Sequence, residues 1–158
     1  MAEKFSTGHA QAVCAAVKTG YANGVLAIFS GAQPTDSNDT EGAGLLLALI
    51  TLSSGAFTAG VATNGLNFDD PVSGVLSKAA AETWSGNGTA AAGASGTIAT
   101  WFRFYANDYV TGASTTAKRF DGAIGSTLST AELKLTVTTV VTGVPVLIDT
   151  FTYTPTRA

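Results

Sequence analysis

The sequence predicts a mainly β protein, an antiparallel β-sandwich or jelly roll preceded by one N-terminal α-helix. Only the first twenty residues show the three- and four-residue spacing of apolar side chains that is typical of a helix. After them the composition changes to Thr, Ser, Gly and β-branched or aromatic residues, which favour strands and tight turns. Turn signals recur about every 8–12 residues without strand–helix alternation, which indicates an antiparallel all-β architecture.

The helix is expected to begin at a cap formed by Ser6 or Thr7 and to end at Gly20 or Gly24. Its apolar side chains recur at three- and four-residue steps, at Ala10, Val13, Cys14, Val17 and Tyr21. This spacing predicts a helix that packs one face against the rest of the protein.

Residues 1–24 are expected to form this helical segment, and residues 25–158 a β-sandwich that makes a single domain overall with it. The chain has 158 residues and a mass of 15.9 kDa, a common size for one domain. Strands are expected at Val25–Ser30, Leu45–Leu52, Gly55–Val61, Gly65–Phe68, Gly74–Lys78, Thr97–Tyr105, Lys118–Ile124, Ala131–Val141 and Val144–Thr154.

Turn and loop signals separate these strands. Asn64-Gly65 predicts a two-residue hairpin turn, and Thr142-Gly143 is expected to act in the same way. Gly31–Gly44 and Gly86–Gly96 lack a strand pattern and are expected to be surface loops. Leu133, Leu135 and Val137 alternate with polar residues, which predicts one packed and one exposed face for their strand.

The composition excludes several classes of partner. Only 12% of the residues are charged, the formal net charge is −3, and the eight Lys and Arg residues form no basic stripe, so no nucleic acid is expected to bind. The longest apolar run, Leu45–Ile50, is far shorter than the roughly 20 residues of a membrane span. The start of the chain has no secretory signal pattern, so we expect it to fold first in a cytosol.

Residues with catalytic or metal-binding chemistry are few. Cys14, the single cysteine, excludes an internal disulfide and a Cys-rich zinc site. His9, the single histidine, would lie about 140° round the helix from Cys14, so we expect an exposed imidazole and a buried thiol. Asp69 and Asp70 precede Pro71 and predict a turn. Adjacent strand residues point to opposite faces, so the two would not converge on one substrate, and the alternative is a hydrolase that uses Asp69 or Asp70.

An acidic cluster lies in the first long loop, at Asp36, Asp39 and Glu41. Carboxylates at this spacing attract calcium if the loop folds around the ion, but the spacing is not that of an EF-hand. Polar turn chemistry, in which side chains accept bonds from nearby backbone amides, explains the same residues without a metal. We expect no cofactor.

The aromatic segment around Arg103 allows two interpretations. Trp101, Arg103 and Tyr105 would share one face of a strand, and Phe102 and Phe104 the other. In the first interpretation the segment is a central strand and Arg103 is paired internally. In the second, the face that carries Arg103 anchors a partner, because Trp, Tyr and Arg dominate interface hot spots.

The shortage of charge points to an assembled protein. Soluble monomers keep apart from their copies with surface charge and blunted strand edges. With 24 Thr and 12 Ser residues, the outer faces of this protein are expected to be hydroxyl-rich and nearly neutral. We therefore expect a structural protein that buries its sheets, loops and terminal segments against neighbouring chains, including further copies of itself.

Several ordered landmarks resemble a family of small structural proteins of tailed bacteriophages and prophages. They lie between about Val25 and Pro155, at Leu26–Pro34, Gly44–Leu46, Asn64–Phe68, Trp84–Gly86, Thr100–Tyr105, Arg119–Gly122 and Ile148–Thr152. The resemblance implies a virion component that is not an enzyme. The capsid cement or decoration proteins of this kind have a jelly-roll fold, sit between major capsid subunits and commonly form dimers or trimers.

Two alternatives remain beside a cement protein. One is a tail, collar or baseplate component, and the other is a carbohydrate-binding or receptor-binding module that uses Trp84, Trp101 and Tyr109 as stacking platforms. For the cement protein, we expect the Gly31–Gly44 loop and the N-terminal segment to reach neighbouring subunits. The candidate interaction residues are Asp36, Asp39, Glu41, Trp101, Arg103 and Tyr105.

Overall fold

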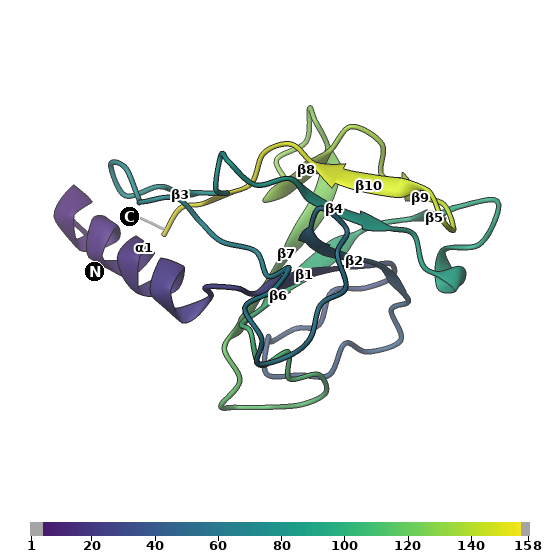
Figure 1. Cartoon of the computed structure of the whole chain (residues 1–158), viewed down its shortest axis with the longest axis horizontal. Helices are drawn as coiled ribbons and strands as arrows, with labels where there is room; N and C mark the ends of the chain where they lie inside the picture. Colours follow the sequence, from purple (N-terminus) through teal and green to yellow (C-terminus); the bar gives the residue numbers. More distant parts are fainter. Residues whose placement is uncertain (1–4, 156–158) are drawn as a thin grey trace.

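The computed structural model describes residues 5–155. Within this range one α-helix precedes a series of short strands, with a single 3₁₀ turn at Ala90–Ala92 (Figure 1). The elements are α1 (Thr7–Gly20), β1 (Val25–Phe29), β2 (Leu46–Leu52), β3 (Leu76–Ser77), β4 (Trp84–Asn87), β5 (Thr97–Ile98), β6 (Trp101–Tyr105), β7 (Arg119–Ser126), β8 (Leu133–Leu135), β9 (Thr139–Val140), β10 (Pro145–Ile148) and β11 (Thr152–Tyr153).

The helix confirms its predicted cap and packed face. The hydroxyl of Ser6 accepts a hydrogen bond from the backbone N–H of His9 at 3.1 Å, which satisfies one of the free donors of the first turn. Ala10 and Cys14 are fully buried. Because Cys14 belongs to the main hydrophobic cluster, the helix and the sheet share one core.

Seven strands form one curled sheet in the order β10-β4-β2-β1-β6-β7-β8. Neighbouring strands are antiparallel except β7 and β8, which are parallel. The two edge strands, β8 and β10, approach each other without pairing, so the sheet is nearly closed (Figure 1). The mainly β fold with one N-terminal helix is confirmed, whereas a sandwich or jelly roll is not, because this one mixed sheet curls round the core.

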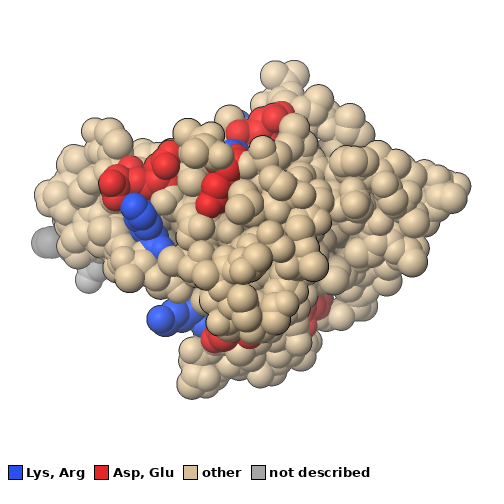
Figure 2. All heavy atoms as spheres, viewed as in Figure 1, with Lys and Arg blue, Asp and Glu red and all other residues tan. Residues whose placement is uncertain are grey.

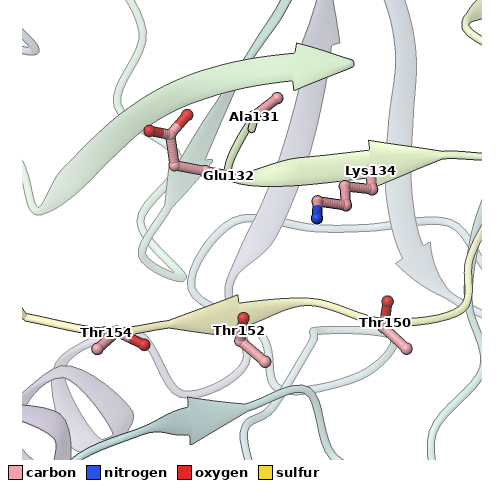
Figure 3. A pocket seen from close by; sticks show the side chains of 6 residues that line it. All are labelled: Ala131, Glu132, Lys134, Thr150, Thr152 and Thr154. Atoms are coloured by element: carbon pink, nitrogen blue, oxygen red, sulfur yellow. The ribbon is translucent and has the colours of Figure 1, made fainter. Parts of the chain in front are cut away.

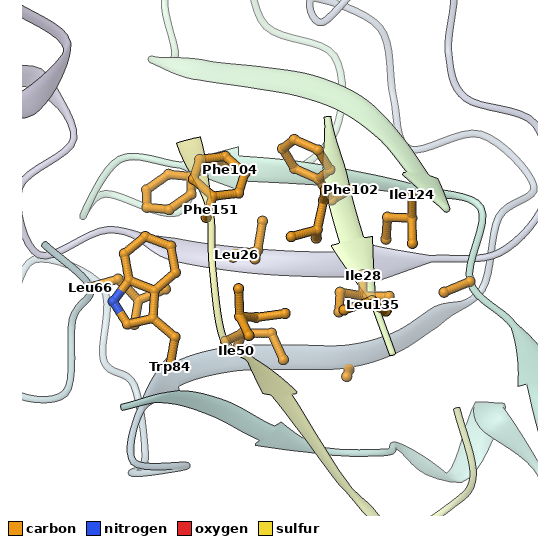
Figure 4. Packing of buried hydrophobic residues seen from close by; sticks show 14 of the residues in the cluster. Leu26, Ile28, Ile50, Leu66, Trp84, Phe102, Phe104, Ile124, Leu135 and Phe151 are labelled. Atoms are coloured by element: carbon orange, nitrogen blue, oxygen red, sulfur yellow. The ribbon is translucent and has the colours of Figure 1, made fainter. Parts of the chain in front are cut away.

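The core lies on the inner face of this sheet. Aromatic and aliphatic side chains from the sheet and from the C-terminal segment meet there (Figure 4), among them Leu26, Ile28, Trp84, Phe102, Phe104 and Phe151. Every residue of β1 and β6 is buried, which means that these two strands are covered on both faces. A second, smaller cluster lies on their outer face, formed by Val25, Ala27, Phe29, Trp101 and Tyr105.

Several predicted strands are wrong in extent. Gly55–Val61 contains turns and no strand, and Gly65–Phe68 makes only isolated bridges to other segments. The three longest predicted strands each divide in two, because the chain changes partner: β5 pairs with β9, whereas β6 pairs with β1 and β7. Val137 lies beyond the end of β8 and is exposed, so the predicted packed face extends only to Leu133 and Leu135.

The structure also corrects the predicted loop at Gly86–Gly96. Its first residues belong to β4, which lies inside the sheet between β2 and β10. A Cβ atom on Gly86 would lie 2.1 Å from the carbonyl oxygen of Leu49, so only glycine permits this close approach of two strands. The same residue that suggests a loop in the sequence is therefore required in a strand.

The two predicted turns are present, but neither joins a hairpin. The backbone N–H of Gly65 bonds to the carbonyl of Ala62, and no paired strands flank this turn. The second turn, at Thr142-Gly143, connects β9 to β10, which pair with β5 and β4 respectively. Each turn therefore connects segments that pair elsewhere in the fold.

Candidate functional site

The aromatic face of β6 is covered by two loops, residues 31–44 and 106–118, which we call the cap. The indole N–H of Trp101 donates to the carbonyl of Ser30 at 3.2 Å, and its ring stacks on Phe29 with 4.3 Å between centroids. Trp101, Arg103 and Tyr105 are all buried. The central-strand interpretation is therefore confirmed, and an exposed anchor formed by these three side chains is wrong.

Arg103 is the centre of the polar contacts beneath the cap. Its guanidinium is fully buried and donates two parallel hydrogen bonds to Asp121, at 2.6 and 2.7 Å. A third bond reaches the carbonyl of Asp39 in the first cap loop, at 2.9 Å. Such bidentate, charge-assisted pairing supplies the partners that a buried guanidinium requires.

Glu41 joins the two cap loops to the sheet. Its carboxylate accepts hydrogen bonds from the hydroxyl of Tyr105 at 2.6 Å and from the backbone N–H of Gly112 at 3.1 Å. Burial alone would raise the pKa of this carboxyl, but the bonds from Tyr105 and Gly112 and the charge of Arg103 outweigh it and hold the pKa below the usual 4.5. Burial and the same carboxylate raise the pKa of the Tyr105 phenol.

Arg119 makes a second set of contacts between the cap loops. In the sequence it stands only as part of the landmark Arg119–Gly122, with no role assigned to it. It is buried at the start of β7, and it donates only to backbone carbonyls. The acceptors belong to both loops: Ser37, Asn38 and Asp39 in the first, and Val110, Gly112 and Ser114 in the second. These contacts span up to 82 residues of sequence, so no local pattern could have indicated them.

The acidic cluster follows the predicted turn chemistry. A side-chain oxygen of Asp36 accepts from the backbone N–H of Asn38 at 2.7 Å, and Asp39 accepts from the N–H of Asp36 at 3.2 Å. Asp36 and Asp39 are exposed, whereas Glu41 points inward to Tyr105. Across residues 5–155, no three His, Cys, Asp or Glu side chains are grouped so that they could hold a metal ion.

The remaining catalytic candidates do not converge. His9 is exposed and stacks on Phe5, while Cys14 is buried in the core. Asp69 accepts a bond from the N–H of Ala80, and Asp70 forms an exposed ion pair with Lys18 at 2.6 Å. The two carboxylates therefore have separate partners.

The proposed stacking platforms are not available at the surface. Trp84 is fully buried and donates its indole N–H to Glu82 at 2.8 Å, and Trp101 is buried beneath the cap. Tyr109 is half-buried and packs edge-on against Phe57 and Tyr105. The structure therefore contradicts the prediction that Trp84 and Trp101 stack on a carbohydrate.

A pocket of about 400 Å³ lies between the β8 side of the sheet and residues 150–154. Figure 3 shows Glu132 and Lys134 on the β8 side and Thr150, Thr152 and Thr154 on the opposite strand. A side-chain oxygen of Glu132 already accepts a bond from the backbone N–H of Ala123. The walls thus offer threonine hydroxyl groups, one carboxylate and one ammonium group. These groups can bind polar molecules but do not form a paired acid and base.

Another surface lies at the end of the molecule that contains β5, β9 and the 3₁₀ turn. It is built from residues 87–100 and 136–147, which we call the uncharged end, because neither segment contains Asp, Glu, Lys, Arg or His. Strand β5 pairs with β9, and Asn87 pairs with Pro145, so the two segments lie side by side. Figure 2 shows no charged residue on the visible face of this end.

Large aliphatic side chains are exposed on the uncharged end. Four of them lie 50–65% exposed: Ile98, Val137, Val144 and Leu147. Ile98 lies directly opposite Thr139 in the β5–β9 pair, and Val137 lies two positions before β9 begins. Val137 and Leu147 line one hollow of about 270 Å³, whose wall also includes Leu135 and Asp149 from outside the uncharged end.

Comparisons with known proteins give no match. The chain matches no protein-family model, no curated protein and no solved structure. The resemblance to phage structural proteins therefore rests on the sequence landmarks alone. Within residues 5–155, no helix is long and apolar enough to cross a bilayer.

Proposed function

We propose that this chain is a structural subunit of a virion, acting as a capsid cement or decoration protein between major capsid subunits. The observation that carries the proposal is the uncharged end, with its four exposed aliphatic side chains. Exposed apolar surface without charge is typical of interaction sites, because burying it against another protein removes it from water. The bacteriophage setting comes from the sequence resemblance.

The construction of the cap supports a structural role. The two cap loops are held to the sheet and to each other by buried guanidinium groups and by Glu41, all within this chain. Asp36 and Asp39 lie on the outside of this cap. In the proposed function, they and the N-terminal segment remain the candidate contacts with neighbouring capsid subunits.

Mass action explains how such a protein would stabilise a shell. A subunit that binds the assembled lattice, and not its separate parts, shifts the equilibrium toward the assembled state. The binding energy then depends on apolar and hydrogen-bonded contacts, since few charges are present on the surface to contribute.

The proposal is tested on phage particles from cells that encode this chain. Heads and tails are separated on a density gradient, and the chain is quantified in each by mass spectrometry. We expect it in heads, at a constant ratio to the major capsid protein. Recovery only in tails would favour a tail, collar or baseplate component, and absence from the particles would overturn the proposed function.

A rebinding experiment tests the surface itself. Heads stripped of the chain are incubated with purified protein, washed, and heated until they release DNA. Wild-type protein is expected to rebind and raise the release temperature, whereas Ile98→Lys combined with Val137→Lys is expected to do neither. The matched control is Leu128→Lys, because Leu128 is 97% exposed but lies outside the uncharged end. Equal rebinding by both variants would contradict the assigned surface.

A further inference from the structure

Two adjoining hollows form one groove beside the C-terminal segment. The pocket of about 400 Å³ between β8 and residues 150–154 shares Glu132, Thr152 and Thr154 with a second hollow of about 250 Å³. The second hollow is lined by four aromatic side chains that belong to the core or pack against it, namely Phe102, Phe120, Phe151 and Tyr153. The groove therefore has a polar part and an aromatic part.

The polar part contains side chains whose hydrogen-bonding capacity the protein does not use. Exposure alternates along residues 150–154, and the exposed positions are Thr150, Thr152 and Thr154. Within residues 5–155, neither their hydroxyls nor the ammonium of Lys134 form a hydrogen bond or an ion pair. In Figure 3, Lys134 extends from β8 toward the strand of threonines. Water satisfies these groups in the free protein, and ligand hydroxyls can replace that water.

The aromatic part offers ring faces to an apolar side of a ligand. Phe120 and Tyr153 are half-buried, with 5.6 Å between their ring centroids. The C–H groups of a sugar ring carry a weak positive charge and pack on the negative faces of such rings. Asp121 also lines this hollow, but its carboxylate is already paired with Arg103.

The charges of the groove favour an uncharged ligand. Glu132 and Lys134 supply one charge of each sign, so an anion would meet the carboxylate and a cation would meet the ammonium. A neutral hydroxyl group can instead donate to the first and accept from the second. A peptide added as a strand fits less well, because β8 has three residues and β11 has two, whereas strands usually have about five or six.

We propose that this groove binds a neutral saccharide, whose hydroxyls bond to Lys134, Glu132 and Thr152 and whose C–H face packs on Phe120 and Tyr153. The volume of the larger hollow, about 400 Å³, is within the range of roughly 300–1,000 Å³ found for small-molecule sites. The aromatic part supplies the apolar wall and the polar part the few hydrogen-bonding groups that such sites combine.

The groove is separate from the surfaces considered above. It contains none of the predicted stacking platforms Trp84, Trp101 and Tyr109, and no residue of the uncharged end. The inference therefore goes beyond the proposed function and does not depend on it.

The test begins with an array of neutral glycans, and the glycan that binds most tightly is titrated into isotope-labelled protein and followed by NMR. We expect shifts of the backbone amides of residues 131–134 and 150–154. Lys134→Ala combined with Thr152→Val should raise the dissociation constant at least about tenfold, because it removes one charged and one neutral hydrogen bond. Lys118→Ala combined with Thr63→Val, at exposed positions outside the groove, is the matched control and should bind like the wild type.

Salt and a charged glycan show whether the ligand is neutral. The dissociation constant should change less than about twofold between 0.05 and 0.5 M NaCl, and a sulfated heparin hexasaccharide should bind more weakly than the neutral glycan. Circular dichroism shows whether each variant is folded, and Thr154→Val replaces Thr152→Val if that variant unfolds.

Several results would overturn the inference. They are the absence of any neutral glycan that binds with a dissociation constant below about 10 mM, tighter binding of the heparin fragment, amide shifts outside the groove, or equal affinity of the wild type and the groove variant. A chain that binds the glycan but is absent from heads would contradict only the proposed function. A chain that is present in heads but binds no glycan would contradict only the saccharide site.

Discussion

The cap, which covers the outer face of β6, and the uncharged end, which contains β5 and β9, are stabilised in different ways. In the cap, Arg103 and Arg119 are buried and bind two loops through Asp121, Glu41 and backbone carbonyls. The uncharged end has none of these ions. Its segments are joined by backbone hydrogen bonds and by glycines that allow close packing.

The difference shows how a protein with few charges distributes them. Buried ions are costly unless each is paired, but they hold irregular loops in one arrangement when the pairing is complete. Among the described residues, every buried side-chain N or O atom has a hydrogen-bond partner. The cap is therefore complete within one chain, whereas the uncharged end leaves apolar side chains in water that a neighbour can cover.

The largest expected effect comes from breaking the ion pair in the cap. Arg103→Leu leaves the carboxylate of Asp121, whose side chain is 4% exposed, without its bidentate partner. We expect the free energy of unfolding to fall by about 3–5 kcal/mol. Urea denaturation followed by tryptophan fluorescence measures it, since Trp101 lies next to Arg103.

The control for this variant is Lys18→Leu, which removes an ion pair at the surface. Exposed pairs contribute little, so the urea midpoint should not change measurably. If the free energy of unfolding of Arg103→Leu fell by less than about 1 kcal/mol, the buried ion pair would not be what stabilises the cap.

A smaller loss is expected from crowding the backbone of the uncharged end. A Cβ atom on Gly88 would lie 2.0 Å from the carbonyl oxygen of Val141, so Gly88→Ala must displace one of the two segments. We expect a loss of about 2–3 kcal/mol, which thermal or urea unfolding would measure.

Gly8→Ala is the matched control for Gly88→Ala. Gly8 lies in α1, and a Cβ atom there would meet only the Ser6 hydroxyl, at an ordinary 3.8 Å. Because alanine favours helix, this variant should be as stable as the wild type or slightly more stable. Equal stability of both variants would show that the close approach at Gly88 does not hold the end together.

The smallest effect is expected at Glu41 and depends on pH. Glu41→Gln keeps the side-chain shape but weakens the bonds from Tyr105 and Arg103, so we expect a loss of about 1–2 kcal/mol at pH 7. The pKa of Glu41 is lowered on folding, so its contribution is present above pH 4.5 and is lost as pH falls through the folded-state pKa.

Urea midpoints at pH 7 and pH 3 check this sign. The gap between wild type and Glu41→Gln should be narrower at pH 3 than at pH 7. Asp36→Asn, which changes an exposed carboxylate of the same cap, is the comparison variant. A gap that widened toward low pH would contradict the contacts assigned to Glu41.

Elements with a local signal could be predicted from the sequence. The cap at Ser6, the buried Cys14 and the strands around Leu26 and Phe102 depend on spacing and composition alone. Strand β4 could not be predicted, because its Gly86 is typical of a turn and is required only by the approach of Leu49.

The uncharged end and the cap also differ in how far the sequence predicts them. The missing ionisable residues of the uncharged end are visible in the sequence, but only the β5–β9 pairing shows that the two segments form one surface. The burial of Arg103 depends on Asp39 and Glu41, more than sixty positions away, and neither spacing nor composition indicates such contacts. Side chains that suggest a binding site in the sequence can therefore be buried in the fold, where they hydrogen-bond loops to the sheet.

Hydrogen–deuterium exchange most directly tests whether the uncharged end is the contact surface of this protein. The chain is compared free at low concentration and incorporated in purified heads. We predict slower exchange of amides in residues 87–100 and 136–147 in the particle, with little change under the cap around Arg103. Unchanged exchange in both of these segments, or slower exchange confined to the cap, would contradict the account.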